Sequence, residues 1–277
     1  MVIKNKSGEV RLIWRLALLV LPFLIIAYLL RLIPIRIQIG ILINQGIPVA
    51  FAESRARTLF MEDPVASSII GIIQGLTWYL LVFIIINWVE KGSLTLSSFG
   101  LAAKGNSLRL ISFGVLLGLV MYLGYLGVGT LFEENSLVWS LKKLGILPFL
   151  LIFFNLLING FGEETAFRAY FQTRLVNRHG LWLGIALASI TFILLHLIIY
   201  PFTGMVIVAG IFLAGFFGIL YIWTGSVIMV GIMHTIFNLA PRVLGNWPSD
   251  LSLLIVNALA FLLAAVLFSR KNRQTSL

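Results

Sequence analysis

Runs of predominantly apolar residues recur along the whole chain, and this pattern restricts it to a helical membrane fold. A membrane-spanning helix needs about 20 such residues, because each residue advances it by about 1.5 Å across a hydrocarbon layer of about 30 Å. The predicted fold class is therefore all-α, a polytopic membrane bundle of about eight transmembrane helices. The predicted spans are Leu12–Leu30, Val65–Val89, Leu108–Phe132, Leu147 onward through two glutamates, Leu181–Tyr200, Thr203–Trp223, Val227–Ala240 and Leu251–Phe268.

The composition supports this fold class and excludes several functions. Of 277 residues, 60% are hydrophobic and 11% are charged, which leaves too little polar surface for a soluble domain of this size. The net charge of +10 is scattered over the loops and not gathered on one module, so we expect no nucleic-acid partner. The absence of cysteine excludes disulfides, thiolate metal ligands and a cysteine nucleophile.

Basic residues at both ends predict the orientation of the chain. Positively charged segments stay cytoplasmic, and an even number of spans places both termini on that side. The arginines of the segment Arg31–Pro64 contradict this rule, unless the segment forms a helix lying on the membrane surface. The basic residues at the two ends are Lys4, Lys6, Arg11, Arg15, Arg270, Lys271 and Arg273.

We expect a single integral-membrane domain over residues 1–277, with a core at 147–240 that carries the polar site. A connector at residues 90–107 is rich in glycine and serine but also carries spaced apolar side chains, which is typical of a loop lying on the membrane surface. The spacing Gly114-x-x-x-Gly118 predicts a close contact between two helices.

Three charged residues lie inside a segment whose other residues are mainly apolar: Glu163, Glu164 and Arg168. A charge at the bilayer centre costs about 2.5–3.5 kcal/mol on insertion scales, so such groups face a bundle interior and mark a functional path. His196 and His234 are also embedded in apolar runs. Together these side chains predict a polar site inside the membrane.

The depth of two of these side chains can be compared by counting from Gly180. If one helix runs from Leu147 to Asn177, Glu163 lies 17 residues before Gly180 and His196 lies 16 residues after it. In an antiparallel pair these positions have nearly the same depth. The competing interpretation ends the span at Gly162 and places the glutamates at the cytoplasmic face. We favour the continuous helix.

The spacing of the polar residues predicts their roles if they converge. Glu163 can take a proton from water, and His196 can orient that water. His234 and Asn238 share one helix face, and their N–H groups can stabilise an oxyanion. The predicted reaction is attack of water on an acyl centre, most simply a peptide bond.

Glu164 and Arg168 are spaced i and i+4 with the acid first, which predicts a supporting ion pair. A zinc version of the site would use Glu163, His196 and His234 with water in the open position. The spacing His-Glu-x-x-His of soluble metalloproteases is absent, and we prefer the mechanism without metal. Two non-enzymatic alternatives remain: a proton- or ion-coupled transporter, and a silent immunity or scaffold protein.

Three motifs carry a resemblance to a known family. They are Glu163-Glu164-Thr-Ala-Phe-Arg168, Phe192-Ile-Leu-Leu-His196 and His234-Thr-Ile-Phe-Asn238. They resemble the motifs of the CPBP (CAAX protease and bacteriocin-processing, ABI) family of intramembrane proteases.

The resemblance implies an eight-helix membrane fold with the active site inside the membrane. It implies that Glu163 and His196 activate water, that His234 and Asn238 form the oxyanion site, and that the Glu164–Arg168 pair supports them. Zinc stays possible, since members have been described both as metalloproteases and as glutamate proteases. The implied partners are membrane lipids and a membrane-associated peptide or protein, whose C-terminus is lipidated in members that mature prenylated proteins. The expected location is a prokaryotic plasma membrane.

Overall fold

The computed structural model describes residues 10–92, 95–102, 106–132, 145–199, 202–245 and 247–274. The regular elements in these ranges are helices, and the predicted polytopic helical bundle is confirmed. Within the same ranges, seven helices are long and apolar enough to cross a membrane. α7 (Leu181–Ile199) has 19 residues and α9 (Val227–Leu244) has 18, so the predicted fifth and seventh spans are similar in length.

The chain divides into two compact units. The first comprises Met1–Leu94 and Leu144–Gly162, and the second comprises Thr95–Lys143 and Glu163–Leu277. Helices of the first unit are α1 (Leu12–Asn44), α2 (Val49–Glu62), α3 (Pro64–Ile84), the π-helix η1 (Ile85–Val89) and most of α5 (Ile146–Glu164). Those of the second are α4 (Ser107–Phe132), the π-helix η2 (Thr165–Gln172), α6 (Thr173–His179), α7 (Leu181–Ile199), α8 (Gly204–Thr224), α9 (Val227–Leu244) and α10 (Asp250–Gln274).

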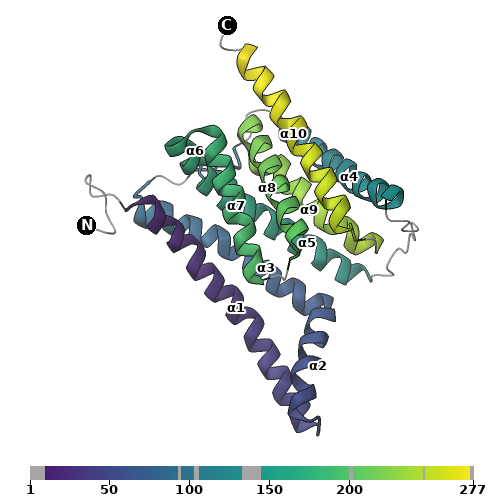
Figure 1. Cartoon of the computed structure of the whole chain (residues 1–277). Helices are drawn as coiled ribbons and strands as arrows, with labels where there is room; N and C mark the ends of the chain where they lie inside the picture. The colour runs from purple at the N-terminus through teal and green to yellow at the C-terminus, as the bar shows by residue number, and fades with distance from the viewer. Residues whose placement is uncertain are drawn as a thin grey trace. The chain divides into compact units, whose positions relative to one another are not determined.

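In the first unit, α1 continues well past the predicted end of the first span, and α2 packs back against it (Figure 1). The fully buried Ala52 and Ala56 lie against Ile39 and Leu42, so the two helices approach closely. At 33 residues, α1 is about 50 Å long, which exceeds the hydrocarbon thickness of about 30 Å. The segment Arg31–Pro64, whose arginines contradict the orientation rule, thus consists mainly of the second half of α1 and of α2.

Glycines let α3 and α5 meet at backbone distance within the first unit. A Cβ atom at Gly162 would lie 2.6 Å from the carbonyl oxygen of Gly75. One turn earlier, the Asn159 side-chain amide donates a hydrogen bond of 2.6 Å to the carbonyl oxygen of Gly71. Small residues and amide hydrogen bonds are how membrane helices associate when lipid is as apolar as the side chains.

In the second unit, α8 packs against both α7 and α10, as Figure 1 shows. A buried amide links three of the helices: Tyr125 of α4 donates to Asn257 of α10 at 2.5 Å, and Asn257 donates to the carbonyl oxygen of Ala209 in α8 at 3.1 Å. Gly180, with φ of +82°, makes the tight turn that reverses the chain between α6 and α7. This turn is the one from which the depths of Glu163 and His196 were counted.

The predicted close contact at Gly114 and Gly118 is confirmed, and it joins α4 to α9. A Cβ atom at Gly114 would lie 2.6 Å from the carbonyl oxygen of Met229, and one at Gly118 would lie 2.8 Å from Cβ of Ile236. Since real Cβ atoms do not approach backbone this closely, α4 must shift to accept a side chain at Gly114.

We expect Gly114→Ala to lower the free energy of unfolding by about 1–3 kcal/mol, the usual cost of overpacking. The measurement is thermal or denaturant unfolding of the purified protein in detergent. Gly127→Ala is the matched control, because nothing lies within 4 Å of a Cβ at that position of the same helix. Equal stability of the two variants would contradict the close packing of α4 on α9.

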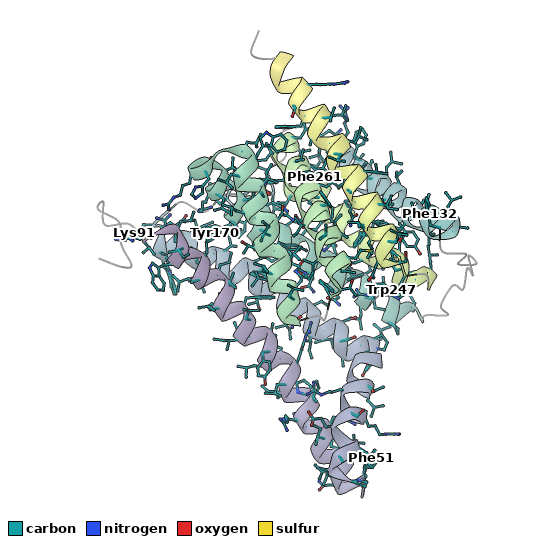
Figure 2. All side chains as sticks on the ribbon, viewed as in Figure 1. Phe51, Lys91, Phe132, Tyr170, Trp247 and Phe261 are labelled. Atoms are coloured by element: carbon teal, nitrogen blue, oxygen red, sulfur yellow. The ribbon has the colours of Figure 1, made fainter. Side chains whose placement is uncertain are left out.

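Large apolar side chains are exposed on many of the described helices. Phe51 in α2 is 68% exposed and Trp247, just before α10, is 61% exposed (Figure 2). Apolar surface of this extent marks a protein that faces membrane or partners and not water alone.

Candidate active site

The helix that carries the two glutamates is continuous from Ile146 to His179, as predicted. After Glu164 it widens into the π-helix η2, whose eight residues are all buried. The backbone N–H of Thr173 bonds the carbonyl oxygen of Arg168, five residues earlier. Short π-helical segments inside α-helices occur frequently at functional sites. No pattern in the sequence indicated this π-helix.

Glu164 and Arg168 form the predicted ion pair. Arg168 Nε donates to Glu164 Oε2 at 2.9 Å, and both side chains are 0% exposed. The guanidinium lies over the ring of Phe192 in α7, with Cζ 5.2 Å from the ring centroid, which is the geometry of a cation–π contact. The pair therefore lies in the interior of the second unit and joins η2 to α7.

His234 is bound to Glu164, a contact that the sequence interpretation did not foresee. Its Nδ1 lies 3.0 Å from Glu164 Oε1. Because an ionised carboxylate only accepts hydrogen bonds, Nδ1 carries the proton and donates it. Glu164 thus accepts from Arg168 with one oxygen and from His234 with the other, so a single carboxylate links η2 to α9.

Glu163 faces the two imidazoles. Its Oε2 lies 3.9 Å from His196 Nε2 and 3.8 Å from His234 Nε2. The side chains of Glu163, His196 and His234 are 19%, 25% and 12% exposed. These three groups are therefore reachable from outside the protein interior, whereas the Glu164–Arg168 pair is not.

The protonation of His196 follows from its backbone contact. Its Nδ1 lies 2.8 Å from the carbonyl oxygen of Phe192, one turn earlier in α7. A carbonyl oxygen can only accept, so Nδ1 donates, and in the neutral imidazole Nε2 is an acceptor. Glu163 Oε2 and His196 Nε2 are then two acceptors too far apart for a direct hydrogen bond, which is the spacing that a bridging water fits.

Asn238 lies one helical turn after His234 on α9 and is partly buried. The contacts described above bring together Glu163, Glu164, Arg168, His196 and His234. It places Asn238 on the same helix as His234 at the i+4 position.

Glu163 Oε2 lies farther from both imidazole nitrogens than the ligand atoms of a bound zinc ion lie from one another. A tetrahedral zinc with bonds of about 2.1 Å separates neighbouring donor atoms by about 3.4 Å. The separations of 3.8 and 3.9 Å around Glu163 are longer. Among the residues that the structure describes, no group of three His, Asp or Glu side chains could hold a metal ion.

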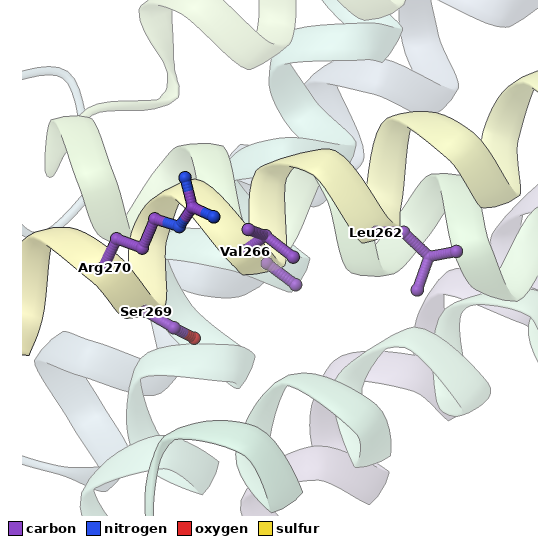
Figure 3. Close-up of a pocket in the computed structure, with 5 residues that line it drawn as sticks. Leu262, Val266, Ser269 and Arg270 are labelled. Atoms are coloured by element: carbon purple, nitrogen blue, oxygen red, sulfur yellow. The ribbon is translucent and has the colours of Figure 1, made fainter.

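A separate shallow depression of about 360 Å³ lies on α10 (Figure 3). Its lining consists of α10 residues, namely Leu262, Ala265, Val266, Ser269 and Arg270. None of the predicted site residues contributes to it, and its lining is mainly apolar. It has no part in the polar cluster.

Comparison with known proteins agrees with the position of this cluster. Residues 145–240, about a third of the chain, match the family described as type II CAAX prenyl endopeptidase Rce1-like. No curated protein and no solved structure matches the chain. The matched segment contains all of the predicted site residues, from Glu163 to Asn238. The resemblance of this chain to the CPBP family of intramembrane proteases is thereby confirmed over residues 145–240.

Proposed function

We propose that the protein is an intramembrane endopeptidase that hydrolyses a peptide bond in a membrane-associated protein or peptide with water activated by Glu163. The observation that carries the proposal is the position of Glu163 Oε2, 3.9 Å and 3.8 Å from the Nε2 atoms of His196 and His234. The match to the CAAX prenyl endopeptidase family supports the same reaction class.

The proposed first step is attack of water on the scissile carbonyl carbon. A water between Glu163 and His196 gives one proton to Glu163 as its oxygen forms the new bond to carbon. The resulting tetrahedral intermediate carries a negative oxygen. When the C–N bond breaks, Glu163 returns the proton to the leaving nitrogen, which departs as an amine. A base within reach of the proton through one water is the geometry that general base catalysis needs.

His234 and Asn238 are proposed to stabilise the negative oxygen. Because Nδ1 of His234 already donates to Glu164, its Nε2 can donate only if the imidazole carries both protons. The positive charges of Arg168 and His234 then balance the two glutamates, which a low-dielectric site favours. Each oxyanion donor contributes about 3 kcal/mol to the transition state.

The substrate that this site would meet is held at the membrane. The matching family is described as a CAAX prenyl endopeptidase, and we propose a substrate with a lipid-modified cysteine near its C-terminus. We place the protein in a prokaryotic plasma membrane with both termini in the cytoplasm, where its basic ends favour them.

The test of the proposed function is cleavage in proteoliposomes. A farnesylated CAAX peptide is mixed with the reconstituted protein, and the products are identified by mass spectrometry. We expect release of the C-terminal tripeptide, and slower cleavage of the same peptide without its lipid. Failure to cut either this peptide or a panel of membrane-anchored peptides would refute the proposal.

We expect cleavage to persist after chelation, because the proposed base is the Glu163 carboxylate and the described residues contain no group of three His, Asp or Glu side chains that could hold a metal ion. The measurement compares the cleavage rate before and after dialysis against phenanthroline, with the metal content of the protein determined in parallel. Loss of activity that returns on adding zinc would show that a metal replaces the proposed glutamate-activated water.

A further inference from the structure

The segment Phe99–Gly100 connects η2 and α9, two of the helices that carry the polar cluster. Thr165, at the start of η2, donates its hydroxyl proton to the carbonyl oxygen of Phe99 at 3.2 Å. The next carbonyl oxygen, that of Gly100, accepts from the backbone N–H of Val227 at 2.8 Å and from the hydroxyl of Ser226 at 3.2 Å. Two consecutive carbonyls therefore bind η2 and the first residues of α9.

These anchoring points are directly linked to the site. Thr165 follows Glu164 in the chain, and Val227 begins α9, seven residues or about 10 Å before His234. The bond between Glu164 and His234 joins the same two helices further along. The segment Phe99–Gly100 and the Glu164–His234 bond thus both connect the helix of the glutamates to α9. The contacts of Phe99–Gly100 set the spacing between these helices, and the Glu164–His234 bond must span that spacing.

The space between η2 and α9 at position 100 accommodates glycine and no larger residue. Gly100 is buried and has φ of +67°, in the left-handed region. A Cβ atom there would lie 2.8 Å from Cβ of Ala169 in η2 and 2.8 Å from Cγ1 of Val227 in α9. Real Cβ atoms do not approach other atoms this closely, so any side chain at Gly100 would push η2 and α9 apart.

We propose that Phe99–Gly100 is a backbone clamp and that Gly100 is a positioning residue, which sets the spacing between the glutamates of α5 and His234 of α9. The clamp touches no reacting atom and acts only through the placement of Glu163, Glu164 and His234. Its effect on turnover rests on the proposed function, whereas its effect on α9 does not.

The test begins with Gly100→Ala in the full-length, reconstituted protein. We expect kcat to fall at least tenfold with little change in KM, because the displaced groups act on the transition state and not on the anchored substrate. Gly46→Ala is the matched control. Gly46 also has positive φ, at +86°, but nothing lies within 4 Å of a Cβ there. Gly46→Ala therefore introduces the same kind of backbone strain without disturbing the clamp, and its kcat should equal that of the wild type.

A second substitution separates positioning from general damage. Gly100→Ala combined with Ala169→Gly removes one of the two atoms that the new methyl group meets, so kcat should recover in part. Thr165→Val, which removes the hydroxyl that binds Phe99, should lower kcat, and Thr165→Ser should retain it. Full activity of Gly100→Ala, or no recovery in the double variant, would overturn the clamp.

Hydrogen exchange tests the clamp without any assay of turnover. In Gly100→Ala, amides in the first two turns of α9 should exchange faster, while Gly46→Ala should leave them unchanged. Unaltered exchange in Gly100→Ala would overturn the clamp even if the protein is a protease. Absence of cleavage by the wild type, with the expected change in exchange, would refute the proposed function and leave the clamp supported.

Discussion

Glu163→Gln is expected to reduce the rate of peptide cleavage by about 10²–10⁴-fold, the usual contribution of a positioned general base. Glutamine keeps the shape of the side chain but cannot take the proton of the attacking water. The partial exposure of Glu163 leaves room for the amide, so the variant should fold and insert as the wild type does. The measurement is single-turnover cleavage of a membrane-anchored peptide in proteoliposomes.

Glu53→Gln provides the control for this substitution. Glu53 lies in α2, outside the polar cluster, where it forms an exposed pair with Arg57 at 2.8 Å. Its replacement should leave the cleavage rate unchanged. If Glu163→Gln cleaves as fast as Glu53→Gln, Glu163 is not the base.

Arg168→Met is expected to lower the free energy of unfolding by about 3–5 kcal/mol, because it removes the arginine partner of the buried Glu164 carboxylate. Arg168 Nε is the partner of Glu164 Oε2, and both side chains are 0% exposed. The loss should also reduce cleavage, since Glu164 holds Nδ1 of His234. The measurements are unfolding in detergent and cleavage by the fraction that remains folded.

The chain offers a matched control for this pair as well. Arg57 and Glu53 have the same i and i+4 spacing, but their side chains are 62% and 52% exposed. Exposed pairs contribute about 0–1 kcal/mol, so Arg57→Met should have little effect. Adding Glu164→Gln to Arg168→Met should restore part of the lost stability, because the buried carboxylate that has lost its arginine is then neutral. Equal stability of Arg57→Met and Arg168→Met would contradict a buried pair.

The part of the site that could be predicted is local in the chain. The similar depth of Glu163 and His196 followed from counting along two helices on either side of the turn at Gly180, and Glu163 Oε2 lies 3.9 Å from His196 Nε2. The Glu164–Arg168 pair needed only the i and i+4 geometry of a helix. Continuous hydrophobic runs likewise fixed the helical membrane fold.

The parts that could not be predicted depend on contacts between helices distant in sequence. The bond from His234 to Glu164 depends on how α9 packs against η2, which no spacing within one segment specifies. The π-helical segment is defined by hydrogen bonds between residues five apart, and the identities of its eight residues do not indicate them. The hydrogen bond between Gly100 and Val227 depends on a close approach of the two backbone segments. A glycine permits this approach, but its presence in the sequence does not predict it. That the connector around Gly100 lies on the membrane surface stays a prediction.

The most direct test of water activation by Glu163 is a single turnover in H₂¹⁸O, with the cleaved peptide and the protein analysed by mass spectrometry. If Glu163 activates water, the heavy oxygen should appear in the new carboxylate of the peptide and not in the side chain of Glu163. Heavy oxygen in the Glu163 carboxylate would show that Glu163 attacks the substrate itself, and would contradict the proposed mechanism.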